Sequence, residues 1–245
     1  MTLNTNGWPH SRLWRFLYIP RVPEPEAMAD EAEASAYESQ VAEPNLSQSD
    51  QRLVNRVLAH RPVRDVVDIG TGPGQIPVLL TKSSPDLSVI GVDLSEAMLA
   101  LARRNAAEAG VDNRVHFIRA EATRTCLPAH SADVVICNSA LHHFTAPVSV
   151  FNEMHRLLRP GGLAVIRDLL RPSRFLSAAH IAFFGRHYRG KTRALFGVSV
   201  LAAYTVAEVR ELIAESNLAG AKVFREDMVH LIASYQAKAP VGLRI

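Results

Sequence analysis

The feature that most constrains this chain is VVDIGTGPGQ, residues 66–75, in which an apolar run is broken by three glycines at alternate positions. An apolar run that ends at glycine and leads into PVLLTKS predicts a buried strand, a tight loop and a helix. Glycine lets the backbone turn sharply and lets a ligand lie directly against it. A strand that is followed at once by a helix predicts a parallel sheet, because the helix carries the chain back to the start of the next strand.

The same alternation of strand and helix continues along the chain. Strands are expected at residues 65–70, 88–94, 114–122, 132–139 and 162–170, with helices between them. The last two apolar segments, 221–227 and 230–237, are joined by too few residues for a crossover and therefore predict an antiparallel pair. The expected fold is α/β, a doubly wound and mostly parallel seven-stranded sheet with an antiparallel edge strand.

Composition excludes several classes of protein. Hydrophobic residues make up 48% and charged residues 21% of 245 residues, with a net charge of +3, which is ordinary for a globular protein. Two cysteines, Cys126 and Cys137, are too few for a disulfide framework or a cysteine-rich metal site, and no metal site is expected. No signal-peptide pattern and no apolar stretch of 18 residues occur, so the expected location is the cytoplasm.

The glycine loop does not suit a dinucleotide. Gln75 stands at the sixth position of the loop, where a dinucleotide fingerprint has glycine, and no Gly-Lys-Ser/Thr follows. Asp68 would repel a pyrophosphate but suits an ammonium group, and Asp93 ends the next strand, where a carboxylate accepts from ribose hydroxyls. S-adenosylmethionine carries an ammonium, a ribose and a sulfonium and no phosphate, so it fits these residues better than NAD.

Five blocks occur in order, DIGTGPG, GVDLSEAML, AEA, DVVICNSALHH and LRPGG. Together they resemble the class I S-adenosylmethionine-dependent methyltransferases, over about residues 60–170. The resemblance implies which residues bind the cofactor: Asp68, Gly70, Thr71, Gly72 and Gly74 for its methionine part, Asp93 for the ribose, Leu94 for the adenine, Glu121 and Ala122 for the adenine edge, and Asn138 near the transferable methyl. Glu121 stands where the family usually has aspartate.

The candidate catalytic residues follow the fourth and fifth strands, at the sheet edge where ligands of such folds bind. They are His142 and Asp168, with His143 as a weaker candidate, since histidine is the side chain type that can accept a proton near neutral pH. The alternatives are that His142 packs against the cofactor loop and that Asp168 pairs with Arg167 or Arg171. The absence of an Asn/Asp-Pro-Pro-Tyr/Phe motif after the fourth strand and of a cysteine nucleophile favours a small-molecule acceptor over a nucleic acid.

The flanking regions are expected to cover the active site. Residues 1–55 form an N-terminal arm or helical cap, and the methyltransferase domain, 56–245, carries a lid insertion at 171–204. Residues 24–50 hold eight acidic residues and no Lys or Arg, whereas 169–207 hold no acidic residue. This contrast favours packing of the arm on the insertion; binding of an anion or nucleic acid, and contact of 175–193 with a membrane surface, are the alternatives. Tyr37 is a further cofactor-contact candidate.

The expected function is transfer of a methyl group from S-adenosylmethionine to an oxygen, nitrogen or sulfur of a small molecule. Three alternatives stay open: an RNA or protein methyltransferase, a non-catalytic S-adenosylmethionine-binding protein, and an NAD-dependent oxidoreductase. Gln75 and Asp68 disfavour the last of these.

Overall fold

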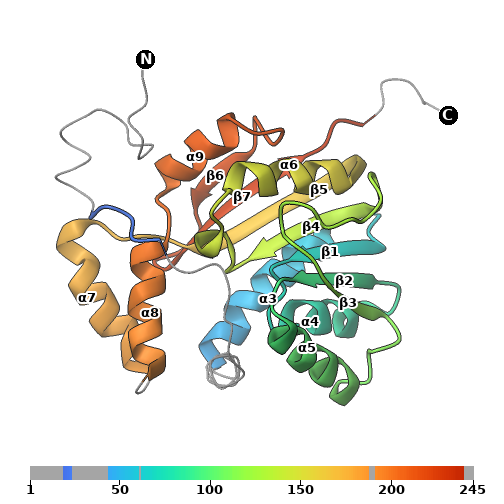
Figure 1. Ribbon diagram of the computed structural model, residues 1–245, viewed down its shortest axis with the longest axis horizontal. Coiled ribbons are helices and arrows are strands. Elements are labelled where there is room, and N and C mark those ends of the chain that lie inside the picture. Colours follow the sequence, from blue (N-terminus) through green and yellow to red (C-terminus); the bar gives the residue numbers. More distant parts are fainter. Residues whose placement is uncertain (1–18, 24–43, 61, 188–190, 240–245) are drawn as a thin grey trace.

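A computed structural model describes residues 19–23, 44–60, 62–187 and 191–239 (Figure 1). Its centre is a seven-stranded sheet in the order β3-β2-β1-β4-β5-β7-β6. The strands are β1 (Asp65–Ile69), β2 (Ser88–Asp93), β3 (Val115–Arg119), β4 (Ala132–Asn138), β5 (Leu158–Leu169), β6 (Lys222–Arg225) and β7 (His230–Gln236). All seven expected strands are confirmed, and β5 begins four residues earlier than the sequence indicated.

The first five strands are parallel, and the two C-terminal strands form the expected antiparallel pair. β7 runs antiparallel to β5 and lies second from the sheet edge, so that β6 is the edge strand itself. The short connection from β6 to β7 is the reason, since it allows no crossover and reverses the chain at once.

Helices cover both faces of this sheet (Figure 1). α3 (Pro44–Ala59), α4 (Gln75–Ser83) and α5 (Glu96–Glu108) lie on one face, and α6 (Pro147–Leu157) and α9 (Val206–Ala214) on the other. Neighbouring strand residues therefore serve different cores: Val66 packs on the side of α3 and α4, and Val67 on the side of α6. Burial of both faces explains why the central strands are apolar almost throughout.

The helix ends follow the sequence signals. Ser95 caps α5, where its Oγ accepts a hydrogen bond from the Met98 N–H at 3.3 Å. Thr205 and Glu208 form the expected capping box at the start of α9, in which each side chain accepts from the other residue's backbone N–H.

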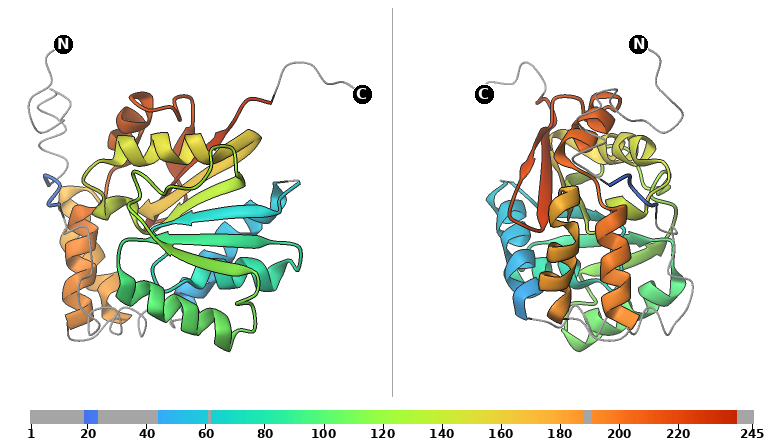
Figure 2. Two further views of the ribbon diagram at one scale, coloured as in Figure 1. Left: turned by 45° about the vertical axis from the view of Figure 1, so that its right-hand side comes forward. Right: turned by 90° about the vertical axis from the view of Figure 1, so that its left-hand side faces the viewer.

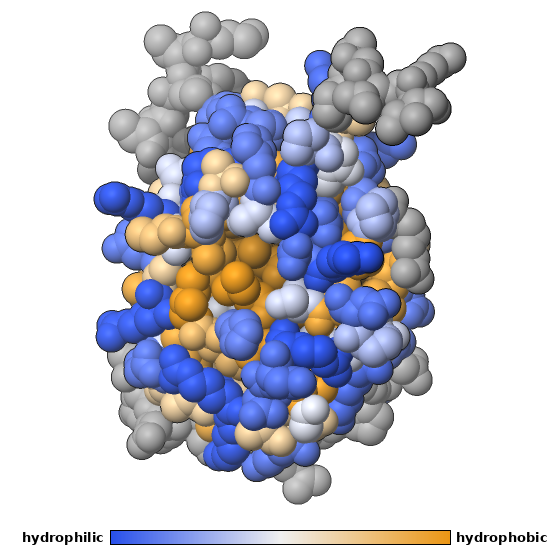
Figure 3. All heavy atoms as spheres, turned by 90° about the vertical axis from the view of Figure 1, so that its right-hand side faces the viewer, coloured by the Kyte–Doolittle hydropathy of each residue, from blue (hydrophilic) through white to orange (hydrophobic). Residues whose placement is uncertain are grey.

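Figure 3 views the side of the molecule at which the parallel strands begin, where hydrophobic residues gather in the middle between hydrophilic ones.

The insertion after β5 forms a pair of helices beside the carboxyl ends of the parallel strands (Figure 2). They are α7 (Arg174–Phe184), followed by the 3₁₀ turn η2 (Gly185–His187), and α8 (Lys191–Ala202). Arg21 ties the N-terminal region to this cap, because its Nε donates to the Ala202 carbonyl at 2.6 Å and its Nη2 to the His142 carbonyl at 2.6 Å. Residues 24–43 of the acidic arm, Tyr37 among them, lie outside the described residues.

Candidate active site

The glycine loop connects β1 to α4 with three left-handed residues. The φ angles of Gly70, Gly72 and Gly74 are 72°, 53° and 79°, a region that favours glycine. A Cβ on Gly70 would lie 2.5 Å from the Ala140 Cβ, whereas a Cβ on Gly72 would meet no atom within 4 Å. Gly70 thus allows close packing against the segment after β4, and Gly72 leaves its backbone open to the cavity in front of it.

That cavity, of about 330 Å³, lies at the carboxyl ends of the parallel strands. Nine of the predicted cofactor-binding residues line it: Asp68, Gly70, Thr71, Gly72, Asp93, Leu94, Glu121, Ala122 and Asn138. Gly74 does not line it, since a Cβ there would meet the rings and methyl groups of Phe117 and Ala102 within 3 Å. Gly74 therefore serves the packing of the loop on α5 and β3, and it stands directly before the first residue of α4.

Asp68 is a buried carboxylate, and one of its two oxygens has no hydrogen-bond partner among the described residues. Its side chain is 1% exposed, and the Thr71 Oγ donates to Oδ2 at 2.8 Å. Oδ1 is buried and accepts no hydrogen bond from the described residues. Burial raises the pKa of Asp68 to about 7; the Thr71 hydrogen bond opposes the rise, and the negative charges of Asp93 and Asp50 add to it. Such an oxygen fits a ligand that brings a cation and N–H donors, as an ammonium group does.

Asp93 is held in place from both sides. Its Oδ2 accepts from the Gly72 N–H at 2.8 Å and its Oδ1 from the Ser95 N–H at 2.9 Å. Burial raises the pKa of Asp93, and the backbone hydrogen bonds from Ser95, Gly72 and Leu94 partly offset this. Each oxygen keeps a further lone pair, so the fixed carboxylate can accept from two neighbouring hydroxyl groups. Leu94, 37% exposed, adds apolar surface beside it for a flat ring.

Arg167 fixes the orientation of Asn138. The two residues are neighbours across β4 and β5, and the Arg167 Nη1 donates to the Asn138 Oδ1 at 2.9 Å. A guanidinium only donates, so the amide oxygen must point at Arg167 and the amide NH₂ must point away from it. Asn138 lines the cavity and therefore offers it a donor rather than an acceptor.

Arg167 is itself fixed by helix α3. It is 1% exposed, and it donates to Asp50 Oδ1 at 3.0 Å and to the Ser49 hydroxyl. Its Nε lies 3.5 Å from a carboxylate oxygen of Glu226, near the end of β6. The N-terminal helix and the last hairpin thus meet at a buried cation that contacts the cavity residue Asn138.

His142 and Asp168 form a buried pair behind the cavity. The His142 Nδ1 lies 2.6 Å from the Asp168 Oδ1, and the His142 backbone N–H donates to Oδ2 at 2.8 Å. Burial alone would raise the pKa of Asp168, but the charge and hydrogen bonds of His142, helped by the Leu169 N–H, outweigh it and lower the pKa. Asp168 therefore pairs with His142 and not with Arg167 or Arg171; Arg171 donates to Glu208 at 2.5 Å.

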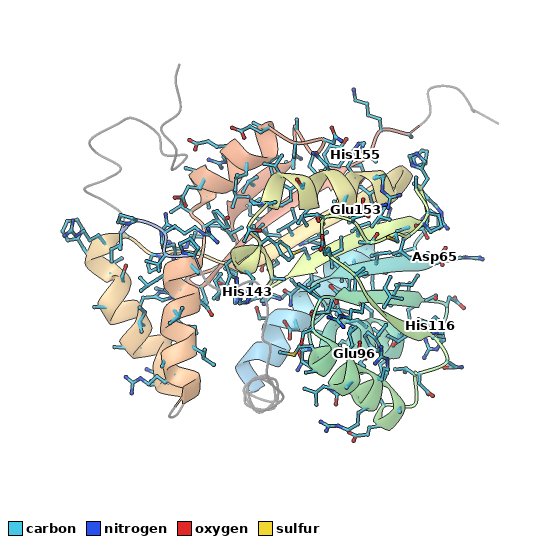
Figure 4. The ribbon with its side chains drawn as sticks, viewed as in Figure 1. Asp65, Glu96, His116, His143, Glu153 and His155 are labelled. Carbon is cyan, nitrogen blue, oxygen red and sulfur yellow. The ribbon has the colours of Figure 1, made fainter. Side chains whose placement is uncertain are left out.

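The histidine that lines the cavity is His143, whereas His142 is 3% exposed and lies outside the lining. Both belong to the 3₁₀ turn η1 (Leu141–His143), and their ring centroids are 4.1 Å apart. Figure 4 shows His143 at this turn, on the side of α7 and α8, with Asp65 and His116 at the opposite edge of the sheet. The geometry thus presents His143 to a ligand and places the His142–Asp168 pair next to it.

Comparison with known proteins agrees with this site. The sequence profile of a methyltransferase domain family matches residues 66–162, which hold the glycine loop, Asp93, Asn138 and His143. Residues 66–162 thus resemble a methyltransferase domain.

The chain has curated relatives and solved structures of similar fold. The chain is 34% identical over 128 residues to 27-O-demethylrifamycin SV methyltransferase of Amycolatopsis mediterranei, covering 51% of this chain and 47% of that one. It is 35% identical over 125 residues to the ubiquinone biosynthesis O-methyltransferase of Methylococcus capsulatus, covering 51% and 50%. The chain thus spans about half the length of the curated relatives that it matches.

A SAM-dependent methyltransferase from Aquifex aeolicus aligns with a TM-score of 0.60 at 18% identity over 84% of this chain and 98% of that one. The plantazolicin methyltransferase BpumL in complex with SAH gives 0.59 at 16% identity over 85% and 96%. At these identities the likeness shows the fold.

In the segment after β4, sequence reasoning named only the two histidines and missed four other residues. Ser139, Phe144, Thr145 and Ala146 also line the cavity. The signal was present, because residues that follow the carboxyl end of a central parallel strand lie at the ligand-binding edge. Ser139 also has a φ of 54°, which marks the turn that brings this segment over the glycine loop. Among the described residues, no group of three or more His, Cys, Asp or Glu could hold a metal ion.

Proposed function

We propose that this chain transfers the methyl group of S-adenosylmethionine to an oxygen, nitrogen or sulfur atom of a small molecule. The observation that carries the proposal is the Oδ1 atom of Asp68, which is buried and accepts no hydrogen bond from the described residues. Asp68 lines the same cavity as Asp93, whose carboxylate is held in place by two backbone N–H groups. An ammonium group would meet Asp68, and the two ribose hydroxyls would meet Asp93. Leu94, Glu121 and Ala122 would surround the adenine.

When bound, S-adenosylmethionine supplies an activated methyl group on a sulfonium that is already a good leaving group. The chain therefore has to align the acceptor and to receive a proton where the acceptor arrives protonated. His143 lines the cavity, and histidine is a side chain type suited to that second task. The His142–Asp168 pair fixes the turn η1 and, through it, the place of His143.

A hydroxyl oxygen is the acceptor atom with the most support. Two of the curated relatives are an O-methyltransferase of ubiquinone biosynthesis and a methyltransferase named for the 27-O position of rifamycin SV. A hydroxyl must lose its proton during the transfer, which gives a histidine in the cavity a chemical task. The DNA and glutamine methyltransferases of the Asn-Pro-Pro-Tyr type are disfavoured, because Ser139, Ala140 and Leu141 follow Asn138 here.

Calorimetric titration with S-adenosylhomocysteine tests the cofactor, and conversion of S-adenosylmethionine in the presence of phenols, alcohols, amines and thiols tests the reaction. We expect micromolar binding of S-adenosylhomocysteine, no binding of NADH, and turnover with a hydroxyl compound. A folded chain that binds NADH instead contradicts the proposal. Cofactor binding without turnover on any acceptor identifies a non-catalytic binder, and turnover only on RNA or protein, sensitive to salt, identifies a macromolecular methyltransferase.

A further inference from the structure

Helix α7 exposes a group of large apolar side chains and buries two polar ones, while its Ile181 and Phe184 are half-buried. Phe175, Leu176 and Phe183 are 65%, 62% and 54% exposed, whereas Ser177 and His180 are 3% and 9% exposed. Surface helices of globular proteins normally show the reverse arrangement, with the apolar stripe turned to the core. Isolated exposed apolar residues are common on any protein, but three large ones on a helix of eleven residues form a patch that needs an explanation.

The exposed side chains of α7 form one continuous strip. Phe175, Ala179 and Phe183 follow one another at a spacing of four residues, which places them in line on a helix. Ala178 and Ala182 are exposed beside them, and Leu176 lies on the other flank. Every exposed residue from Phe175 to Phe183 is apolar, so no polar side chain interrupts this α7 strip.

The charged side chains of the insertion itself are all positive. Arg174, Arg186 and Arg193 are exposed, and Arg174 and Arg186 stand at its two ends. The Arg186 guanidinium lies 3.9 Å from the centroid of the Phe183 ring. Residues 169–207 contain no Asp or Glu that could neutralise these side chains within the insertion.

We propose that the α7 strip docks on the surface of a bilayer that contains anionic phospholipids. The aromatic and aliphatic side chains would enter the boundary between headgroups and acyl chains, and the arginines would meet lipid phosphates. A second copy of this chain fits the strip less well. In a symmetric pair the basic insertion would face itself, and the insertion has no acidic side chain to separate the like charges.

Docking through α7 would also have a spatial consequence for the methyltransferase domain. The second helix of the cap, α8, contacts the turn η1, whose His143 lines the cavity. Figure 2 shows α7 and α8 beside the carboxyl ends of the parallel strands, where the residues that line the cavity lie, so a bilayer against α7 would lie on that side of the molecule. The docking proposal does not depend on the proposed activity, since it rests on the exposed side chains and charges of the cap.

Co-sedimentation with vesicles tests the proposal. The full chain is mixed with vesicles of phosphatidylcholine alone or with added phosphatidylglycerol, at low and at high salt. We expect binding to the anionic vesicles, weaker binding at high salt, and little binding to phosphatidylcholine alone. The triple variant F175S/L176S/F183S should bind roughly tenfold more weakly or worse, because it loses the apolar side chains that enter the boundary region.

Matched variants distinguish vesicle binding through the α7 strip from non-specific adsorption of the protein to vesicles. Met228, 64% exposed at the turn between β6 and β7, supplies the control M228S, which should bind vesicles as the wild type does. R174Q/R193Q should bind anionic vesicles several-fold more weakly and lose most of its salt dependence. Titration with S-adenosylhomocysteine should give the same affinity for every variant, which shows that the domain is folded and keeps failure here distinct from failure of the proposed function.

Three results would overturn the proposal. The first is that the wild type stays in the supernatant with every vesicle. The second is that the triple variant binds vesicles as tightly as the wild type does. The third is a concentration-dependent dimer in sedimentation velocity that the triple variant loses, which would assign the strip to a second copy of the chain.

Discussion

Replacing Asp68 with asparagine should stabilise the cofactor-free protein while it abolishes cofactor binding. Burial raises the pKa of Asp68 to about 7 from an ordinary value of 3.8. Between these two pH values the folded chain keeps a proton that the unfolded chain has released, so Asp68 lowers the stability progressively as the pH rises from about 4 to about 7. A difference of roughly three pH units at about 1.4 kcal/mol each gives about 4 kcal/mol above pH 7.

Asparagine has nearly the same shape, can still accept from Thr71 and does not ionise. The free energy of unfolding of D68N should therefore exceed that of the wild type by an amount that grows with pH, by about 3 kcal/mol between pH 5 and pH 8. Urea unfolding of the cofactor-free proteins at the two pH values measures this difference. D86N, at an exposed position between α4 and β2, is the control, and its difference from the wild type should stay nearly constant.

The same substitution should weaken S-adenosylhomocysteine binding, because the ammonium loses its buried carboxylate. Wild-type affinity should rise as the pH is raised from 6 to 8, since a proton must leave Asp68 before the ammonium can pair with it, and D68N should lose this trend. A D68N protein that is no more stable than the wild type at pH 8 would refute the reasoning about Asp68. Opposite effects on stability and binding are the mark of a residue that serves function at the expense of folding.

Three further substitutions test the rest of the site. D93N should weaken S-adenosylhomocysteine binding by roughly tenfold to a hundredfold in calorimetry, because asparagine has one neutral side-chain oxygen in place of two charged ones and its NH₂ group cannot accept from a hydroxyl; unchanged affinity would exclude Asp93 as the ribose anchor. H143A should lower kcat by roughly a hundredfold with unchanged S-adenosylhomocysteine affinity, and H142A should instead lower the melting temperature; equal kinetics for H143A and the wild type would remove His143 from the reaction. R167M should destabilise the protein by about 3 kcal/mol or more in urea unfolding, since Asp50 would be left buried without its cation, and D50L should restore part of that loss in the double variant; a change below about 0.5 kcal/mol would contradict the buried network.

Much of the cofactor half could be predicted from the sequence because local rules decide it. A strand that is buried on both faces reads as an apolar run, and a polar residue at its end stands out. Asp68 and Asp93 were found in this way, the family resemblance added Asn138, and all three line the cavity. Gly74 was assigned to the cofactor because the glycine spacing does not distinguish a glycine that faces a ligand from one that packs on Phe117.

The helices of the cap could not be predicted in the same detail, because α7 departs from the rule that the apolar side of a surface helix packs on the core. An apolar helix in a sequence is taken to pack on the core through its apolar side, whereas α7 also buries Ser177 and His180 and exposes Phe175 and Phe183. The opposite charges of the arm and the insertion favoured pairing between them. The partner found for the described acidic residue Asp50 is Arg167 of the sheet, so at least that charge is neutralised inside the core and not on the insertion.

The ion pairs at the carboxyl ends of the strands follow from the alternation of side chains between the two faces of the sheet. The sequence shows this alternation, but it does not show which residues of other elements lie against each face. Arg167 and Asp168 are adjacent in β5, so their side chains must point to opposite faces of the sheet and cannot form the pair that their proximity suggests. Arg167 turns to the face of α3 and meets Asp50, and Asp168 turns to the face of η1 and meets His142. One strand end thus supports both halves of the site, orienting Asn138 toward the cofactor from one face and fixing the turn of His143 from the other.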